Sequence, residues 1–60
     1  GPKHVDVKKE GRRYFIRYSA TGEWEKVNKP VIIEKLKAMQ NSTKYTLSHD
    51  AVTLMLDGVL

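Results

Sequence analysis

The segment that most strongly constrains the architecture reads Lys8-Lys9-Glu10-Gly11-Arg12-Arg13-Tyr14-Phe15-Ile16-Arg17-Tyr18. Its glycine can supply the positive φ that a tight turn requires. After this turn, apolar and aromatic side chains alternate with others at the two-residue period of a half-covered strand. One side of the strand should take Tyr14, Ile16 and Tyr18, and the other side Arg13, Phe15 and Arg17. The segment therefore predicts a β-hairpin with an outer face that combines positive charge with an aromatic ring.

Short strands are indicated on both sides of this hairpin strand. Val5 and Val7 alternate with polar residues, as in a half-exposed strand. Residues 19–22, Ser-Ala-Thr-Gly, predict a second turn, and residues 23–27 a third strand that carries the only tryptophan, Trp24. We expect a three-stranded antiparallel meander. Because Trp24 lies between Glu23 and Glu25, which would repel a phosphate backbone, we expect it to pack in the core.

A helix follows the meander. Asn28 can cap its first backbone N–H groups, and Pro30 fits the first turn, where a missing N–H costs nothing. The helix should end at Asn41-Ser42-Thr43, with Glu34 and Lys37 paired on its outer side. Its apolar stripe consists of Ile32, Ile33, Leu36 and Met39.

The last third of the sequence allows two interpretations. Residues 45–48 alternate as a strand does, and residues 52–56 alternate again after His49-Asp50. The rival is a helix that is capped by Ser48 or Asp50 and covers residues 51–56. Alternation and β-branched residues favour a strand, so the predicted order is β-β-β-α-β-β. The fold class is thus α+β, a small antiparallel sheet with a single helix packed on one face.

The chain ends just after another turn signal, Asp57-Gly58, which only Val59 and Leu60 follow. No strand within the chain would then cover the edge of the strand at 52–56. Because a free strand edge invites pairing, we expect a symmetric homodimer through this carboxy-terminal strand. Met55 and Met39, which have apolar neighbours, should fill the core.

Length and composition limit the protein to one domain. The chain has 60 residues and no cysteine, so packing alone must stabilise it. Gly1-Pro2, without a methionine, is typical of the remnant of a cleaved tag. We therefore treat residues 3–60 as a single binding module excised from a longer protein. The absence of cysteine favours an intracellular location, nuclear or cytoplasmic, and no apolar run is long enough to cross a membrane.

The net charge of +4 lies entirely in the first half of the chain. Residues 1–30 hold eight Lys and Arg against four Asp and Glu, whereas residues 31–60 hold three of each. Such an asymmetry favours an anionic partner, either nucleic acid or an acidic protein segment, rather than a membrane. A net charge of this size also serves solubility, so charge alone leaves both interpretations open.

No catalytic constellation is visible in the sequence. His4 and His49 have no cysteine or third histidine with which to hold a metal, and the serines lack a glycine-rich elbow. The four glycines are dispersed, so no phosphate-binding loop is formed. We expect a protein that is not an enzyme, with no catalytic residue, no metal site and no cofactor.

Two stretches resemble known families. Tyr18-Ser19-Ala20-Thr21-Gly22, a short strand and then Lys29-Pro30 opening a helix resemble the core of methyl-CpG-binding-type domains, which implies DNA binding. Tyr45-Thr46-Leu47-Ser48 with residues 52–58 is similar to the opening strands of a polo-box domain, although the segments occur there in the opposite order. That resemblance implies the binding of a phosphopeptide or a protein.

The sequence therefore gives two functional hypotheses. The first is a nucleic-acid-binding module, with DNA as the favoured partner and the basic amino-terminal hairpin as the contact surface. Its cations would meet phosphates, and Phe15 would stack on a base or fill a partner's pocket. The candidate contact residues are Lys8, Lys9, Arg12, Arg13, Phe15, Arg17, Lys26 and Lys29. The alternative is a protein-interaction or dimerisation module that binds through its sheet edge or a helix groove.

Overall fold

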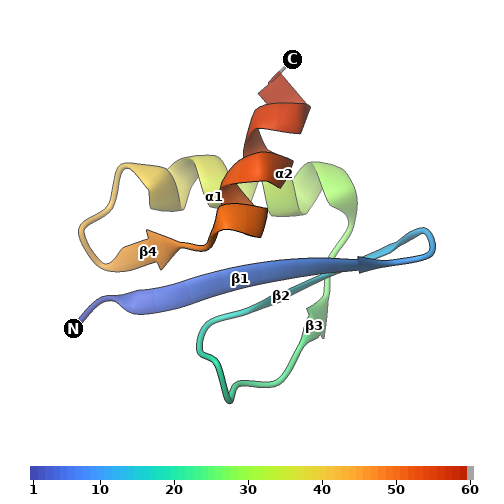
Figure 1. Ribbon diagram of the computed structural model, residues 1–60. Coiled ribbons are helices and arrows are strands. Elements are labelled where there is room, and N and C mark those ends of the chain that lie inside the picture. Colours follow the sequence, from blue (N-terminus) through green and yellow to red (C-terminus); the bar gives the residue numbers. More distant parts are fainter. Residues whose placement is uncertain (60) are drawn as a thin grey trace.

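The computed structural model describes residues 1–59 and has α+β architecture, with four strands and two helices (Figure 1). In chain order the elements are β1 (Lys3–Glu10), β2 (Arg13–Arg17), β3 (Glu25–Lys26), α1 (Lys29–Gln40), β4 (Tyr45–Leu47) and α2 (His49–Val59). The α+β class is confirmed. The predicted single helix and all-antiparallel sheet are not, because the described residues contain two helices and one parallel strand pair.

The predicted hairpin is formed by β1 and β2. Glu10 pairs with Arg13, so the turn consists of Gly11 and Arg12 alone, and Gly11 has the positive φ of 61° that the sequence suggests. The second predicted turn is also present, since the N–H of Gly22 donates to the carbonyl of Ser19 at 3.1 Å. These two turns set the register that distributes the β2 side chains between the two faces of the sheet.

The strands lie in the order β3-β2-β1-β4, so consecutive β3 and β4 occupy opposite edges. The chain must therefore cross the whole sheet between them, and α1 makes this crossing (Figure 1). A helix crossover returns the chain in the same direction, and β4 consequently pairs with β1 in parallel over Lys3–Val5. The prediction of an antiparallel strand here is corrected for this reason.

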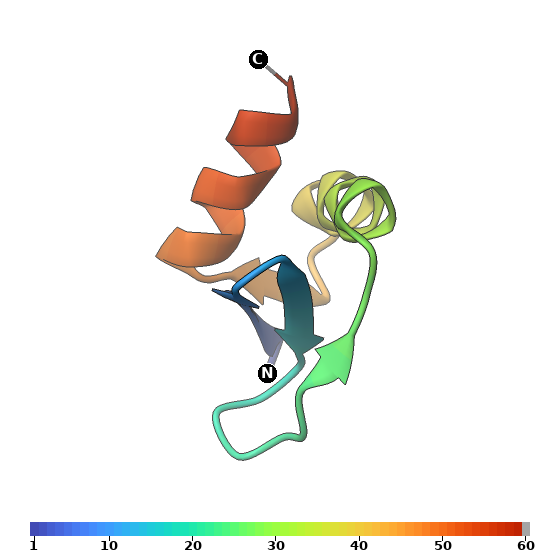
Figure 2. The same ribbon diagram turned by 90° about the vertical axis from the view of Figure 1, so that its right-hand side faces the viewer.

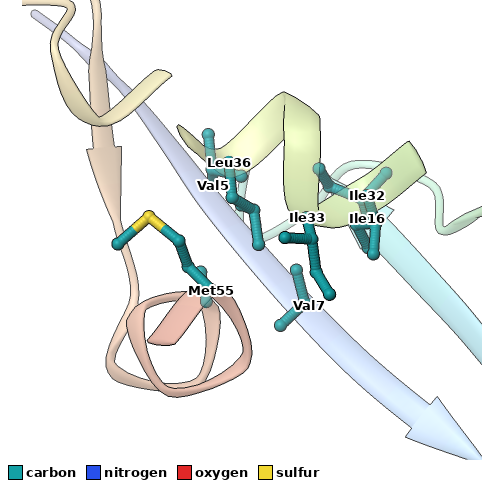
Figure 3. Close-up of a cluster of buried hydrophobic side chains, with 8 residues drawn as sticks. Val5, Val7, Ile16, Ile32, Ile33, Leu36 and Met55 are labelled. Atoms are coloured by element: carbon teal, nitrogen blue, oxygen red, sulfur yellow. The ribbon is translucent and has the colours of Figure 1, made fainter. Parts of the chain in front are cut away.

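Both helices pack on the same face of the sheet and against each other (Figure 2). The core lies between them and the sheet, where Val5, Ile16, Ile32 and Leu36 have no exposed surface (Figure 3). The predicted stripe of α1 is confirmed, with Met39 partly buried at its end. Neither α1 nor α2, the helices of residues 1–59, lies on the opposite face of the sheet.

The start of α1 matches the prediction in position but not in chemistry. Asn28 occupies the N-cap position and Pro30 the first turn, yet the Asn28 side chain makes no capping hydrogen bond. The Nζ of Lys37 lies 3.5 Å from Oε1 of Glu34, as the spacing predicts. Asn41 ends the helix at the expected place.

Residues 49–59 form a helix, so the predicted second strand at residues 52–56 is wrong. The rival interpretation holds: Oγ of Ser48 accepts the N–H of Ala51 at 3.0 Å, which is the bond of an N-cap side chain. Ala51 and Met55 are buried one helical turn apart, whereas Val52 and Leu56 remain exposed. Apolar residues on both sides of the helix produced an alternation that imitates a strand.

Asp57-Gly58 lies inside α2 and makes no hairpin. A Cβ on Gly58 would come within 2.7 Å of Cγ2 of Ile33, so the glycine lets α2 approach α1 closely. Because residues 52–56 are helical, the proposed edge for strand-paired dimerisation does not exist. Leu60, part of the proposed pairing segment, lies outside the described residues.

Neither α1 nor α2 is long and apolar enough to cross a membrane, and these are the helices of residues 1–59.

Candidate nucleic-acid interface

The face of the sheet opposite the helices, which we call the open face, is built by alternate residues of the first three strands. Cross-strand partners share a face, so the register of β1, β2 and β3 defines its members. They are Asp6, Lys8, Glu10, Arg13, Phe15, Arg17 and Lys26. Five of the eight predicted contact residues, four cations and Phe15, therefore lie on one surface. The connection from β2 to β3 extends away from the helices (Figure 2).

Trp24 joins this surface, so its predicted place in the core is wrong. It belongs neither to the buried cluster nor to the residues packed against it. Its ring lies 4.3 Å from Cζ of Arg17 and 4.7 Å from Nζ of Lys8. The flanking glutamates were the misleading signal: Trp24 directly precedes β3, and its ring lies beside Lys8 and Arg17 despite its acidic neighbours.

Lys8 contacts a second ring as well. Its Nζ lies 5.4 Å from the centroid of Phe15, within the range of a cation–π interaction. Phe15 and Trp24 are both half-buried, so each ring leaves part of its surface to solvent. The centre of the open face is thus an aromatic–cationic cluster, defined here as Lys8, Phe15, Arg17 and Trp24.

The carboxylates on the open face offset only part of its positive charge. Arg17 lies 3.8 Å from Asp6, and Lys8 lies 3.8 Å from Glu10. Arg13 and Lys26 are exposed and make no ion pair within residues 1–59. The face retains a positive excess at its rim, where an anion can approach with little desolvation.

Arg17 has an unsatisfied donor at the edge of a small hollow. Its Nε is buried and has no hydrogen-bond partner within residues 1–59. The hollow has a volume of about 270 Å³ and includes His4, Asp6, Ser19 and Ser48 in its lining. Asp6 is already engaged there, since its Oδ1 accepts the Ser48 hydroxyl at 2.8 Å and the Val7 N–H at 2.9 Å. A buried N–H without an acceptor is costly, and the fold carries this cost at Nε of Arg17.

The remaining predicted contact residues lie elsewhere. Arg12 is exposed in the hairpin turn, next to the open face. Lys9 pairs with Tyr14 across the strands, and the Nζ atoms of Lys9 and Lys29 lie 5.5 and 5.7 Å from the Tyr14 ring, on the helix side. The structure therefore divides the predicted set into two clusters on opposite sides of the sheet.

Lys29 is engaged within the fold. Its Nζ lies 3.4 Å from Asp57, so it connects the start of α1 to the end of α2. The hydrogen bond with Asp57 is the main cause that raises the pKa of Lys29 above its ordinary value, with a further contribution from Tyr14. On the covered side, burial raises the pKa of Tyr18, helped by Glu25 and by Tyr45, whose ring centroid lies 6.5 Å from that of Tyr18.

A shallow groove of about 500 Å³ also lies on the helix side. One wall is the stripe of α2 formed by Asp50, Thr53, Leu54 and Asp57. The other wall includes Val7, Lys9 and Tyr14. The groove mixes both signs of charge, and the open face is the more uniformly positive surface. Within residues 1–59 no group of His, Cys, Asp and Glu side chains is placed to hold a metal ion.

No protein-family model, curated protein or solved structure matches this chain. The function must therefore be argued from the geometry of the chain itself.

Proposed function

We propose that this protein is a nucleic-acid-binding module, with DNA as the favoured partner, and that the open face is its contact surface. One observation supports this most directly: four cations and two aromatic rings gather on the one face of the sheet that no helix covers. Cations neutralise phosphates and rings stack on bases, and the two together are typical of nucleic-acid surfaces.

In this proposal, different residues of the open face contact different parts of the nucleic acid. Arg13 and Lys26, which have no ion pair within residues 1–59, meet phosphates at the rim. Phe15 and Trp24 contact bases at the centre. Arg12, in the adjacent turn, extends the phosphate contacts. Lys9 and Lys29 lie on the helix side and contribute only to the long-range field.

A pair of matched lysine variants tests the proposal. Lys26→Gln and Lys35→Gln each remove one charge from an exposed side chain without an ion pair in residues 1–59, the first on the open face and the second on α1. We expect Lys26→Gln to weaken oligonucleotide binding and to lower the slope of log K against log salt by about one unit. Lys35→Gln should leave both nearly unchanged. Fluorescence anisotropy at three salt concentrations measures the affinity and the slope.

Three results would contradict the proposal. They are no binding of single-stranded or duplex DNA at low salt, binding that does not depend on salt, and equal effects of the two variants. The last result would mean that only net charge matters and that the open face has no special role.

The second candidate, a protein-interaction module, is favoured by apolar residues on the outer side of α2. Val52 and Leu56 lie one turn apart with 37% and 49% of their surface exposed, and Val31 of α1 is 49% exposed. Single exposed apolar side chains are common in small domains, but adjacent ones can together form a contact with a partner protein. Sedimentation equilibrium of the wild type and of Leu56→Glu tests self-association through α2, and a monomer over the whole concentration range would exclude it.

A further inference from the structure

We infer that the open face recognises single-stranded rather than duplex nucleic acid, and that Phe15, Lys8 and Trp24 together hold one dinucleotide step. This inference rests on the function proposed above and adds to it the form of the ligand. It also assigns separate contacts to two successive bases and to the phosphate between them.

The shape of the open face disfavours the reading of a duplex. Base edges in B-DNA are reached by an element that enters a groove, usually a helix or a two-stranded ribbon. Here both helices lie on the other face of the sheet (Figure 2), and β1 and β2 are the two inner strands of that sheet and do not form a separate ribbon. The open face instead presents rings on a sheet, and bases must be unpaired and turned outward to stack on them.

The strand register determines how the two rings are spaced. Phe15 pairs with Lys26 and Ile16 with Glu25, so Trp24 comes next to Arg17 in the same direction. Trp24 therefore lies about two residues along the sheet from Phe15, or about 7 Å, and one strand across. Two rings offset in this way can each take one base of an extended strand.

Lys8 lies where the connecting phosphate would be. Its Nζ is 5.4 Å from the Phe15 ring and 4.7 Å from the Trp24 ring, so the ammonium bridges the two. A chain with one base on each ring must bring its linking phosphodiester close to this ammonium. A charge-assisted contact there would strengthen both stacking contacts by fixing the spacing between the bases.

Arg17 extends the path beyond Trp24. Its guanidinium lies 4.3 Å from the Trp24 ring, and its buried Nε has no acceptor within residues 1–59. A phosphate that follows the second base can meet the exposed part of the Arg17 side chain, which is 25% of its surface. The order along the strand is then base on Phe15, phosphate at Lys8, base on Trp24 and phosphate at Arg17.

Trp24 is the only tryptophan, so its fluorescence reports directly on this cluster. The experiment titrates the protein with oligodeoxythymidine, oligouridine, an abasic DNA strand and a mixed-sequence duplex, all matched in phosphate number and salt. We expect the two strands with bases to quench Trp24 and to bind about tenfold or more tightly than the abasic strand. The duplex should bind by charge alone, without quenching. The affinities for oligodeoxythymidine and oligouridine, compared with each other, show whether the protein prefers DNA or RNA.

Two leucine variants at neighbouring positions provide the specific control. Phe15→Leu removes a ring from the open face, and Tyr14→Leu removes one from the covered face. We expect Phe15→Leu to lose about tenfold in affinity for the single strand and nothing for the abasic strand. Tyr14→Leu should leave both affinities unchanged. Circular dichroism melts establish that each variant is folded, and Lys8→Gln provides a second probe of the cluster if Phe15→Leu is not.

The outcomes separate this inference from the function on which it rests. If the duplex binds as tightly as the single strand and Trp24 is not quenched, the dinucleotide model is wrong while nucleic-acid binding stands. If the abasic strand binds as tightly as oligodeoxythymidine, stacking is excluded. If none of the four ligands binds at low salt, the proposed function itself fails.

Discussion

The two faces of this sheet are made by alternate residues of the same strands and differ in almost every physical property. Val7 and Ile16 pair on the covered face and are 4% and 0% exposed. One position along, Lys8 and Phe15 pair on the open face, half-buried and in cation–π contact. The covered face gathers apolar surface under two helices, and the open face gathers cations and rings under none.

This difference assigns stability and the proposed binding to separate sets of side chains. Burial of apolar area is the main stabilising contribution, and it lies almost wholly on the covered face. Exposed charges contribute little to stability, so the open face can change with small effects on folding. Variants of one face should therefore alter one property only, either the stability of the fold or the proposed binding.

The largest effect should come from the covered face. Leu36 has no exposed surface, and Leu36→Ala removes buried methyl groups and leaves a cavity beneath α1. We expect a loss of about 2–5 kcal/mol, most of the stability of a domain this small. Urea denaturation followed by circular dichroism measures it. Lys26→Gln on the open face is the comparison and should change stability by less than about 0.5 kcal/mol.

If Leu36→Ala melts as the wild type does, α1 does not pack as described. If Lys26→Gln costs as much as Leu36→Ala, the two faces are not independent. Either result would contradict the assignment of stability to the covered face and of the proposed binding to the open face.

An intermediate effect is expected at Ser48, which contacts both sides of the sheet. Its hydroxyl donates to Asp6 on the open face and accepts the N–H of Ala51 at the start of α2. Ser48→Ala removes both bonds and should cost about 1 kcal/mol by urea denaturation, the typical value for an N-cap. Ser48→Thr keeps a hydroxyl and should recover most of the loss. Ser42→Ala, which removes an exposed bond to the N–H of Lys44, is the control and should cost less.

Equal stability of Ser48→Ala and the wild type would mean that the cap does not hold α2. A loss that Ser48→Thr does not recover would point to tight packing around the side chain instead of the hydrogen bonds.

Local signals predicted the first half of the fold. Gly11 gave the hairpin, residues 19–22 gave the turn, and the alternation of β2 gave the correct face for Ile16 and Phe15. These features depend on neighbouring residues, so the sequence contains what is needed. The stripe of α1 was predictable for the same reason.

The second half depended on contacts that the sequence does not display. Residues 52–56 alternate like a strand. The packing of α2 on α1 and β1, with Gly58 against Ile33, selects the helix. The signal that could have identified it was Ala51, Met55 and Gly58 on one helical side behind the cap of Ser48. The parallel pairing of β4 likewise follows from the crossing of α1.

The candidate site was predictable in composition but not in grouping. Arg13, Phe15 and Arg17 were assigned to one face from the period of a strand, and the register confirms that they share it. Trp24 was missed because its acidic neighbours suggested the opposite side, while the register of β3 brings it to Arg17. Lys29 was included because of its charge, yet Asp57 holds it on the helix side. Tertiary contacts decided both residues.

The smallest effect should come from Lys29. It is a cation that lies on the helix side of the sheet and pairs with Asp57 there, so its charge should affect stability. Its folded pKa is raised above 10.5, chiefly by the hydrogen bond to Asp57, so the charged form favours the folded state. Its stabilising contribution is therefore fully present below about pH 10.5 and is lost as the pH rises through the higher folded pKa. Lys29→Met keeps the apolar stem and should lower Tm slightly at pH 8, and the difference from the wild type should vanish at strongly alkaline pH. The effect is small because the pair is exposed to solvent. Thermal melts of both proteins from pH 7 upward measure this difference, in which the other titrating groups cancel.

Lys35→Met, on the outer side of the same helix and without an ion pair in residues 1–59, is the control and should show no pH-dependent difference. A Lys29→Met difference that persists unchanged above the folded pKa would show that the charge of Lys29 does not stabilise the contact between α1 and α2.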